Sequence, residues 1–305
     1  MSYKSYKPEI SAIITNELFK GFNKLVYNDE NHTYKLDGID LTSVTKLVSS
    51  YEESVFEAVK VSNISAKSHN DKNEIQNSQY ALSNQYFLDR WKFKGEYTRA
   101  LGSYVHLFAE SFPYFLKADL KEEQMIVDFY NELSTNYIHI CNELKVYNTE
   151  FKFAGTIDLF VYDVKNNEFI IYDWKTSDNL NKSKNGNYKK PFDFFKSTKI
   201  NGYNIQLIHY KYAFEQKFKD TLCLIPIELL VDFDYDKSFV VRNDSNGKYY
   251  YKVRFKVGNL KVISINANNP TYQIIDLYNL DLKGVHNSTE GVTIQKNKKP
   301  DGNRR

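Results

Sequence analysis

The chain has 305 residues, with 41 Lys and Arg against 38 Asp and Glu and a formal net charge of +3. This length allows one large domain with additions or two small domains, and either buries a sizeable core. The net charge is far below the excess that would by itself indicate a nucleic-acid-binding protein, so only local charge is informative. Aromatic residues make up 16% of the chain, enough for large buried surfaces and for rings that could stack on unpaired bases.

Cysteines and apolar runs limit the cellular setting. Cys141 and Cys223 have no paired CxxC spacing, so neither a disulfide framework nor a four-cysteine metal site is expected. The first ten residues, MSYKSYKPEI, lack a charged-then-apolar signal pattern, and no apolar run approaches the roughly 20 residues that span a bilayer. We therefore expect a cytoplasmic protein with no membrane partner.

The N-terminal half is predicted to be mostly helical. Apolar residues at helical spacing predict helices at 9–20, 80–115 and 121–140, the second interrupted near Gly95 and Gly102.

Shorter signals lie between these helices. Two strands within 25–36 are expected to meet at the turn-forming cluster 28–31, and Thr42 or Ser43 could cap a helix through Val48. The stretch 62–79 is rich in Ser, Asn, Lys and Asp, which predicts a mobile excursion.

From residue 144 onward the pattern changes to strand-length runs of β-branched and aromatic residues. Strands are expected at 144–151, 154–164 and 168–174, a helix at 203–218, and further extended segments at 222–233 and in a hairpin turning at Asn246-Gly247. Residues 284–305 predict a loose tail, in which 296–305 carry five basic residues against one acid.

The segment 154–176, AGTIDLFVYDVKNNEFIIYDWKT, predicts two strands joined at Asn166-Asn167. If the hairpin is symmetric about that turn, Asp158 lies opposite Lys175. Asp158, Asp173 and Lys175 then share one face, where directly opposed β-carbons are about 5 Å apart. A slip of one residue would turn one strand over, so the register is a testable prediction.

Two carboxylates on neighbouring strands repel each other unless a cation joins them, and such hard oxygen ligands suit Mg²⁺ or Mn²⁺. Lys175 could then orient or help deprotonate the water that attacks a phosphodiester, while the metal neutralises charge on the phosphate. The alternative is a surface salt bridge between the strands, which is the ordinary arrangement of Asp opposite Lys.

Further short motifs follow in one order along the chain. They are Gly102-Ser-Tyr-Val-His106, Glu143 with Val146, GTID ending at Asp158, Asp173-Trp-Lys175, and Gln206 with Tyr210. In this order they resemble the GxxxH, acidic-strand and QxxxY motifs of the PD-(D/E)xK nuclease superfamily, especially its RecB-like branch. With His32-Thr-Tyr, the LTSVT of 41–45 and Trp91, the arrangement over about residues 31–235 is most similar to phage exonucleases and the mitochondrial genome maintenance exonuclease.

This resemblance implies an α/β fold with a restriction-endonuclease-like core, a mixed central sheet flanked by helices, and a helical N-terminal extension. It implies Mg²⁺ or Mn²⁺ bound by His106, Asp158, Asp173 and the Trp174 carbonyl, with Lys175 acting on water and with Glu143, Gln206 and Tyr210 in the catalytic set. A neutral imidazole suits Mn²⁺ better than Mg²⁺. His106 could instead be a packed helix histidine, and Glu110, one turn further, either a neighbour of its ring or a solvated acid.

The expected organisation is a mostly helical region with a small hairpin at 1–95, a nuclease core at 96–283 and a flexible basic tail at 284–305. The first region could form an arch over a DNA end. Residues 179–199 carry six lysines against one acid, so this loop after the catalytic strand could attract phosphates. Phe192, Phe194 and Phe195 in the loop either stack on bases or anchor it.

The expected function is that of a metal-dependent exonuclease acting on the phosphodiester bonds of linear, single-stranded or frayed DNA in phage DNA processing. The alternatives are a structure-specific endonuclease on the same site, a non-catalytic DNA-binding or phage assembly protein with this fold, and a structural phage component whose metal serves stability.

Overall fold

A computed structural model describes the chain at residues 3–28, 33–52, 57–75, 79–114, 117–177, 179–243 and 245–287. Three predicted features fall outside these residues: residues 29–31 of the predicted turn together with His32, the end of the predicted helix at Phe115, and the tail from residue 288 onward.

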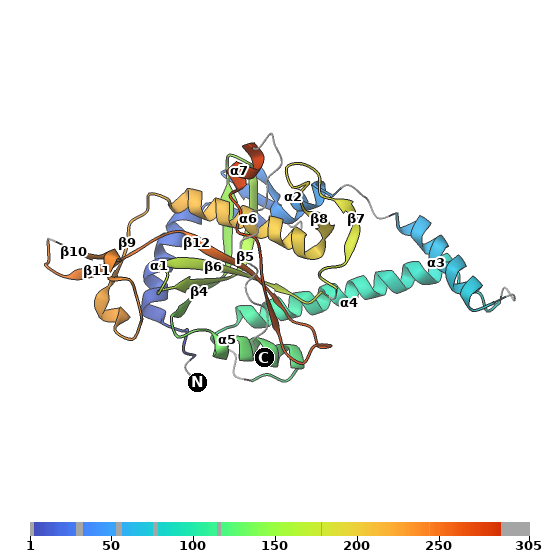
Figure 1. The fold of residues 1–305 in the computed structure, drawn as a ribbon, viewed down its shortest axis with the longest axis horizontal. Helices are drawn as coiled ribbons and strands as arrows, with labels where there is room; N and C mark the ends of the chain where they lie inside the picture. Colours follow the sequence, from blue (N-terminus) through green and yellow to red (C-terminus); the bar gives the residue numbers. More distant parts are fainter. Residues whose placement is uncertain are drawn as a thin grey trace.

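A mixed sheet of eight strands forms the centre of the described structure (Figure 1). Its order is β1-β2-β3-β5-β6-β12-β13, and β4 also pairs with β5. β3 runs parallel to β5 and β12 runs parallel to β6, while the other pairs are antiparallel. The strands are β1 (Leu25–Asn28), β2 (Thr33–Leu36), β3 (Ile39–Ser43), β4 (Tyr137–Asn148), β5 (Phe153–Asp163), β6 (Glu168–Lys175), β12 (Val257–Ser264) and β13 (Gln273–Asp276).

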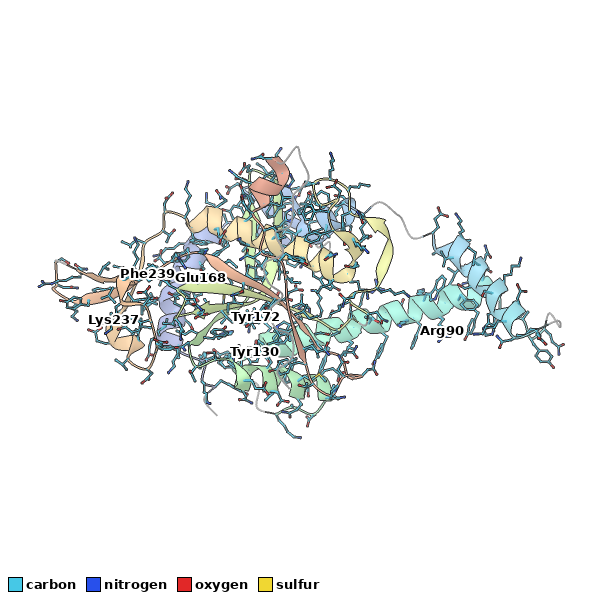
Figure 2. All side chains as sticks on the ribbon, viewed as in Figure 1. Arg90, Tyr130, Glu168, Tyr172, Lys237 and Phe239 are labelled. Carbon is cyan, nitrogen blue, oxygen red and sulfur yellow. The ribbon has the colours of Figure 1, made fainter. Side chains whose placement is uncertain are left out.

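Helices cover both faces of this sheet. Successive residues of a strand point to opposite faces, and those of β6 are buried on both, so the strand packs against a helix layer on each side. On one face, Phe129 of α5 packs against Tyr172, with ring centroids 5.3 Å apart. Figure 1 shows α5 beside the sheet, and Figure 2 labels Tyr172. On the other face, Phe214 of α6 lies 4.8 Å from Phe160. The helices are α1 (Pro8–Phe22), α2 (Val44–Ser50), α3 (Ala58–Lys72), α4 (Asn84–Glu110), α5 (Lys121–Glu132), α6 (Lys199–Phe218) and α7 (Leu282–Asn287). The predicted α/β class with a helix-flanked mixed sheet is confirmed.

Two smaller sheets lie beside the central one. β9 (Cys223–Pro226), β10 (Val240–Arg242) and β11 (Tyr249–Val253) form a three-stranded sheet, and β7 (Ser183–Asn187) pairs with β8 (Lys196–Thr198). The hairpin predicted at Asn246-Gly247 is confirmed as the β10–β11 connection, where Gly247 has a φ of +69°, a conformation that glycine adopts without steric cost.

The stretch predicted as a mobile excursion is mainly helix α3, so that prediction is wrong for the residues up to Lys72. One of its polar side chains makes tertiary hydrogen bonds: the Asn70 carboxamide donates to the Leu82 carbonyl at 3.1 Å and accepts the Leu82 N–H at 3.0 Å. α3 thereby packs on the outer half of α4, and together they project from the body as an arm (Figure 1).

Two predicted helix boundaries are also wrong. α4 continues through Gly95 and Gly102 without interruption, because each glycine costs a helix interior only about 1 kcal/mol. The helix predicted as far as Ile140 ends at Glu132, and Tyr137 begins strand β4.

The predictions of α1, the β1–β2 pair, β5, β6 and α6 are confirmed, and the strand predicted at 144–151 overlaps the end of β4. The extended segment predicted at 222–233 is wrong beyond β9, because Ile227–Leu230 form a short 3₁₀ helix. Ser43 caps α2 by accepting the Lys46 N–H at 3.3 Å. The sequence did not predict β3, β7, β8, β12 or β13, and β7 and β8 lie in the lysine-rich segment that was expected to be a loop. No helix in the described ranges combines the length and apolar character that crossing a bilayer requires.

Candidate metal site and nucleic-acid interface

The connection between β5 and β6 differs from the predicted two-residue turn. It comprises the four residues 164–167. The Asp163 carboxylate accepts the Asn166 N–H at 3.1 Å, and Asn167 takes a φ of +53°. Asn side chains tolerate this left-handed conformation better than most.

The pairing of the two strands is consequently shifted by two residues. Leu159 lies opposite Tyr172, so Asp158 comes opposite Asp173 and not opposite Lys175, as predicted. A shift of two residues preserves the face on which each side chain points. Asp158, Asp173 and Lys175 therefore still share one face.

β5 and β6 separate where the candidate site begins. Regular pairing ends at Leu159 and Tyr172. Beyond this point the Asp158 carboxylate accepts the Trp174 N–H at 2.8 Å, so a side chain replaces the backbone acceptor that a continued ladder would supply. This bond fixes Asp158 through Oδ2, which is also the oxygen that lies nearest His106.

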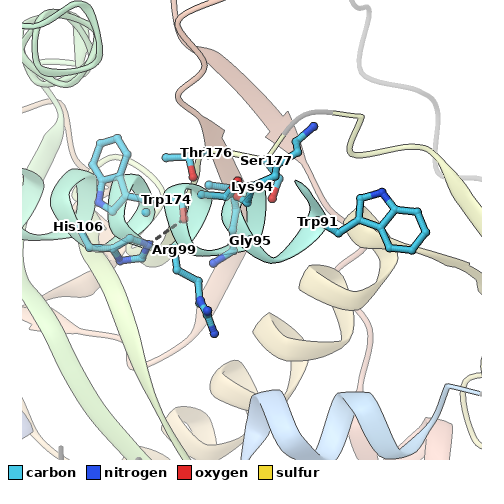
Figure 3. A pocket seen from close by; sticks show the side chains of 11 residues that line it. Trp91, Lys94, Gly95, Arg99, His106, Trp174, Thr176 and Ser177 are labelled. Carbon is cyan, nitrogen blue, oxygen red and sulfur yellow. Dashed lines mark hydrogen bonds between the residues drawn. The ribbon is translucent and has the colours of Figure 1, made fainter. Parts of the chain in front are cut away.

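Helix α4 brings His106 to this point. His106 Nδ1 lies 3.5 Å from Asp158 Oδ2 and 4.0 Å from Glu143 Oε1. Ligand atoms of these three residues all lie within 4.8 Å of one another. His106 Nε2 is 3.1 Å from the Trp174 carbonyl oxygen (Figure 3). One nitrogen with several oxygen donors is a set that fits Mn²⁺ or Mg²⁺.

Glu143 reaches the cluster through an unusual backbone. Its φ is +52°, in the left-handed region that non-glycine residues rarely occupy. β4 also shifts its register against β5 between His139 and Cys141. Strained conformations persist where the surrounding structure enforces them and are frequent at functional sites.

Asp173 and Lys175 form an ion pair beside the cluster. Asp173 is 1% exposed, and among the described residues no donor other than the Lys175 ammonium reaches its oxygens. Lys175 Nζ lies 2.7 Å from Asp173 Oδ2 and 4.8 Å from the centre of the Tyr203 ring. Burial raises the pKa of Asp173 to about 7, although Lys175 opposes the shift. Burial alone would lower the pKa of Lys175, but Asp173 and Asp158 outweigh it and raise that pKa.

The pKa of His106 is raised to about 9: burial opposes this shift, but the carboxylates of Asp158 and Glu143 outweigh it. The cluster thus holds a proton when no other cation is bound. A cluster that retains a proton against burial is one that attracts cations, and a metal ion would compete with that proton.

Gln206 and Tyr210 lie together on α6, as their four-residue spacing predicts. Gln206 Nε2 donates to the Tyr210 hydroxyl at 3.0 Å, and both side chains are buried. Tyr210 packs so closely on Gly155 of β5 that a β-carbon there would lie 2.4 Å from its ring. They support β5 behind the carboxylates.

Other expectations have mixed outcomes. Phe192 and Phe195 are buried in the core, so their proposed stacking on bases is wrong and the alternative of a hydrophobic anchor is confirmed. Glu110 is exposed, and its carbonyl accepts the Asn142 carboxamide at 3.0 Å.

Two cavities of about 510 Å³ each lie along α4 beside the cluster. One includes His106, Trp174 and Lys175; the other includes Lys182 and Lys199 of the lysine-rich segment. Lys94, Arg99 and Thr98 also line this region, and sequence reasoning missed them. The signal was available, because Gly95, Arg99, Gly102 and His106 recur at i, i+4, i+7 and i+11 on one helix face.

No protein-family model matches the chain, and no curated protein matches it.

Proposed function

We propose that this protein is a metal-dependent deoxyribonuclease of the PD-(D/E)xK type that hydrolyses phosphodiester bonds of linear DNA. The observation that supports this best is the convergence of His106, Glu143 and Asp158 next to the Asp173–Lys175 pair. A structural salt bridge explains Asp173 and Lys175 but gives no reason for a histidine and two further carboxylates at the same place.

The residues divide into three tasks in this proposal. His106, Glu143, Asp158, Asp173 and the Trp174 carbonyl would hold Mg²⁺ or Mn²⁺. The ion would supply charge neutralisation at the phosphate. Lys175 would orient the attacking water, since its ammonium is fixed by Asp173 at 2.7 Å. Gln206 and Tyr210 would position β5.

Lys175 provides the direct test. Purified protein should degrade linear DNA with Mg²⁺ or Mn²⁺ and not with chelator. Lys175→Ala should lower the rate about 100-fold or more, the usual loss for a residue that acts in proton transfer. Lys175→Ala also removes the partner of a buried carboxylate, so Lys175→Gln serves as a milder second variant, and both need a melting curve.

The control is Lys248→Ala, which removes an exposed lysine from the β10–β11 connection. It should cleave at the wild-type rate. If folded Lys175 variants retain more than about a tenth of the wild-type rate, Lys175 does not act on the water. If wild-type protein binds DNA but cleaves nothing with either metal, the non-catalytic DNA-binding alternative replaces the nuclease.

A further inference from the structure

The cavity beside His106 extends along α4 well beyond the metal cluster. Its volume of about 510 Å³ lies in the range of about 300–1,000 Å³ that is typical of ligand pockets. Trp91, Arg99 and His106 line it from one helix (Figure 3). Trp91 precedes His106 by 15 residues, about 22 Å along a helix axis. The cavity is therefore longer than a single metal site requires.

We propose that this side of α4 is a binding track for one nucleic-acid strand, in which Arg99 contacts a backbone phosphate and Trp91 stacks on an unpaired base. The track rests on the proposed nuclease function and defines where its substrate lies. The stacked base belongs to a nucleotide several positions away from the cleaved bond, because Trp91 is the lining residue of α4 furthest from His106.

Charge supports the phosphate contact. Arg99 is exposed at the cavity and makes no ion pair with any described residue, and the same holds for Lys94. Cations that are not neutralised by neighbouring acids attract phosphates most strongly. Figure 3 shows the Arg99 side chain extending away from α4 between His106 and Gly95, so its guanidinium lies between the metal cluster and the position of Trp91.

The shape of the helix supports the stacking contact. Gly95 lies between Trp91 and Arg99 on the same side, and a β-carbon there would meet nothing within 4 Å. The face of the helix is therefore open where a base would lie next to the indole. Trp91 is half-buried and its ring lies 6.3 Å from that of Phe87, which holds one edge of it in place.

Tryptophan fluorescence gives a test that does not require cleavage. The chain has two tryptophans, and Trp174 is 1% exposed, so a strand that stacks on Trp91 changes the signal of one indole. Oligothymidylate added in chelator should quench the emission of wild-type protein. Trp91→Phe should abolish the quenching while retaining most of the affinity measured by anisotropy of a labelled strand.

Affinity measures the stacking itself. Trp91→Ala should weaken binding of the strand by about 5- to 150-fold, the range for loss of one stacked base. Gly95→Leu should weaken it as well, because the new side chain occupies the cavity without removing any contact. Phe93→Ala is the matched control: Phe93 is 72% exposed and lies on another side of α4, and its loss should change nothing.

Salt dependence measures the phosphate contact. Arg99→Gln should reduce the slope of log affinity against log salt by about 0.7, the value for one phosphate on a single strand. Arg90→Gln removes the same charge from the projecting part of α4 (Figure 2). Arg90 lies nine residues earlier, about 180° around the helix, and this control should leave the slope unchanged.

The results separate this inference from the proposed function. If DNA is cleaved but Trp91→Ala and Arg99→Gln bind and cleave as the wild type does, the track is wrong and the nuclease stands. If quenching and the slope change occur but no metal supports cleavage, the track stands as a strand-binding site and the nuclease is wrong.

Discussion

Asp173 combines near-complete burial with a lack of hydrogen-bond donors to its oxygens other than the Lys175 ammonium, among the described residues. A buried carboxylate in this state resists ionisation, which is why its pKa rises to about 7 from an ordinary value of 3.8. Above pH 7 the folded protein must hold the charged form, and its free energy of unfolding is lowered. The attraction of Lys175 is already included in this pKa, so burial outweighs the ion pair.

Asp173→Asn should therefore abolish cleavage and raise the melting temperature of the chelated protein at pH 8. The expected gain is on the order of 2 kcal/mol, with no gain below about pH 4, where Asp173 is neutral in both folded and unfolded chains. Asp163→Asn is the control, because the Asp163 carboxylate accepts two hydrogen bonds from Asn166 and its replacement should cost stability. A lower melting temperature for Asp173→Asn at pH 8 would show that the ion pair dominates.

Two buried histidines give the opposite pH dependence. Burial lowers the pKa of His139 and of His209 to about 4. Both have fixed partners: His139 Nε2 lies 3.0 Å from Asn142 Oδ1, and His209 Nδ1 lies 2.7 Å from the Ile205 carbonyl oxygen. Between about pH 6.5 and pH 4 the unfolded chain binds a proton at each histidine and the folded chain does not. Stability should therefore be complete above pH 6.5 and fall as the pH falls toward 4.

Each histidine should contribute a slope of roughly 1.4 kcal/mol per pH unit within this window. Urea unfolding of the Asp173→Asn protein in chelator measures this pH slope of the free energy of unfolding without a contribution from the titration of Asp173. His139→Asn in this background should reduce the slope by about the share of one histidine, whatever its effect on stability at pH 8. An unchanged slope would mean that His139 is protonated in the folded protein.

At the scale of elements, the position of β5 depends on how closely α6 approaches it. The Tyr210 ring occupies the space where a side chain at residue 155 would begin. Gly155→Ala should therefore push Tyr210 and α6 away from β5. We expect a loss of about 1–3 kcal/mol in stability, as for other overpacked cores, and slower cleavage because Asp158 follows three residues later on β5.

Gly95→Ala is the matched control for this prediction. Its β-carbon meets nothing within 4 Å, and alanine favours a helix by about 1 kcal/mol, so stability should rise or stay unchanged. Adding Tyr210→Ala to Gly155→Ala should cost less than the sum of the two single changes, because the clash is removed. Strict additivity in urea unfolding would indicate that residue 155 and Tyr210 do not compete for space.

The sequence predicted the face of the hairpin but not its register. Period-two alternation keeps Asp158, Asp173 and Lys175 on one side for every connection that shifts the register by an even number of residues, whereas the register itself depends on the connection. Asn166-Asn167 is a strong turn signal, but Asp163 extends the connection by binding Asn166. Local composition could not show which of these two signals prevails.

Contacts between distant segments were the least predictable part. β12 pairs in parallel with β6, which lies more than 80 residues earlier in the chain. No sequence pattern near β12 indicates that β6 is its partner. The polar composition of 62–79 predicted a mobile segment, yet the Asn70 side chain forms hydrogen bonds that connect α3 to Leu82, just before α4. The approach of Glu143 to His106 likewise depends on a left-handed backbone that no propensity predicts for glutamate.

At the scale of the whole molecule, the candidate site lies between two parts of the chain. α4 and its projecting arm stand on one side. On the other, the lysine-rich segment is joined to the end of α2, because Lys189 donates its N–H to the Tyr51 carbonyl at 2.6 Å and Tyr188 forms a bridge with Glu52. Basic side chains line both parts, including Lys94 on α4 and Lys182 and Lys199 after β6. In the proposed function, a strand that enters between them would be held by its phosphates.

This arrangement bears on whether a DNA end is needed. If the strand must pass between α4 and the lysine-rich segment, a free end should be the route in, and a closed circle should be cut slowly. Linear single-stranded DNA should therefore be degraded with Mg²⁺ or Mn²⁺, while the covalently closed circle of the same sequence largely survives. Binding of the strand should weaken steeply with salt, by about 0.7 in the slope of log affinity against log salt for each phosphate bound. Lys175→Ala incubated with both forms controls for contaminating nucleases. Equal cutting of circle and line by the wild type would replace the exonuclease with an endonuclease on the same residues, because His106, Asp158, Asp173 and Lys175 would still be required for every cut.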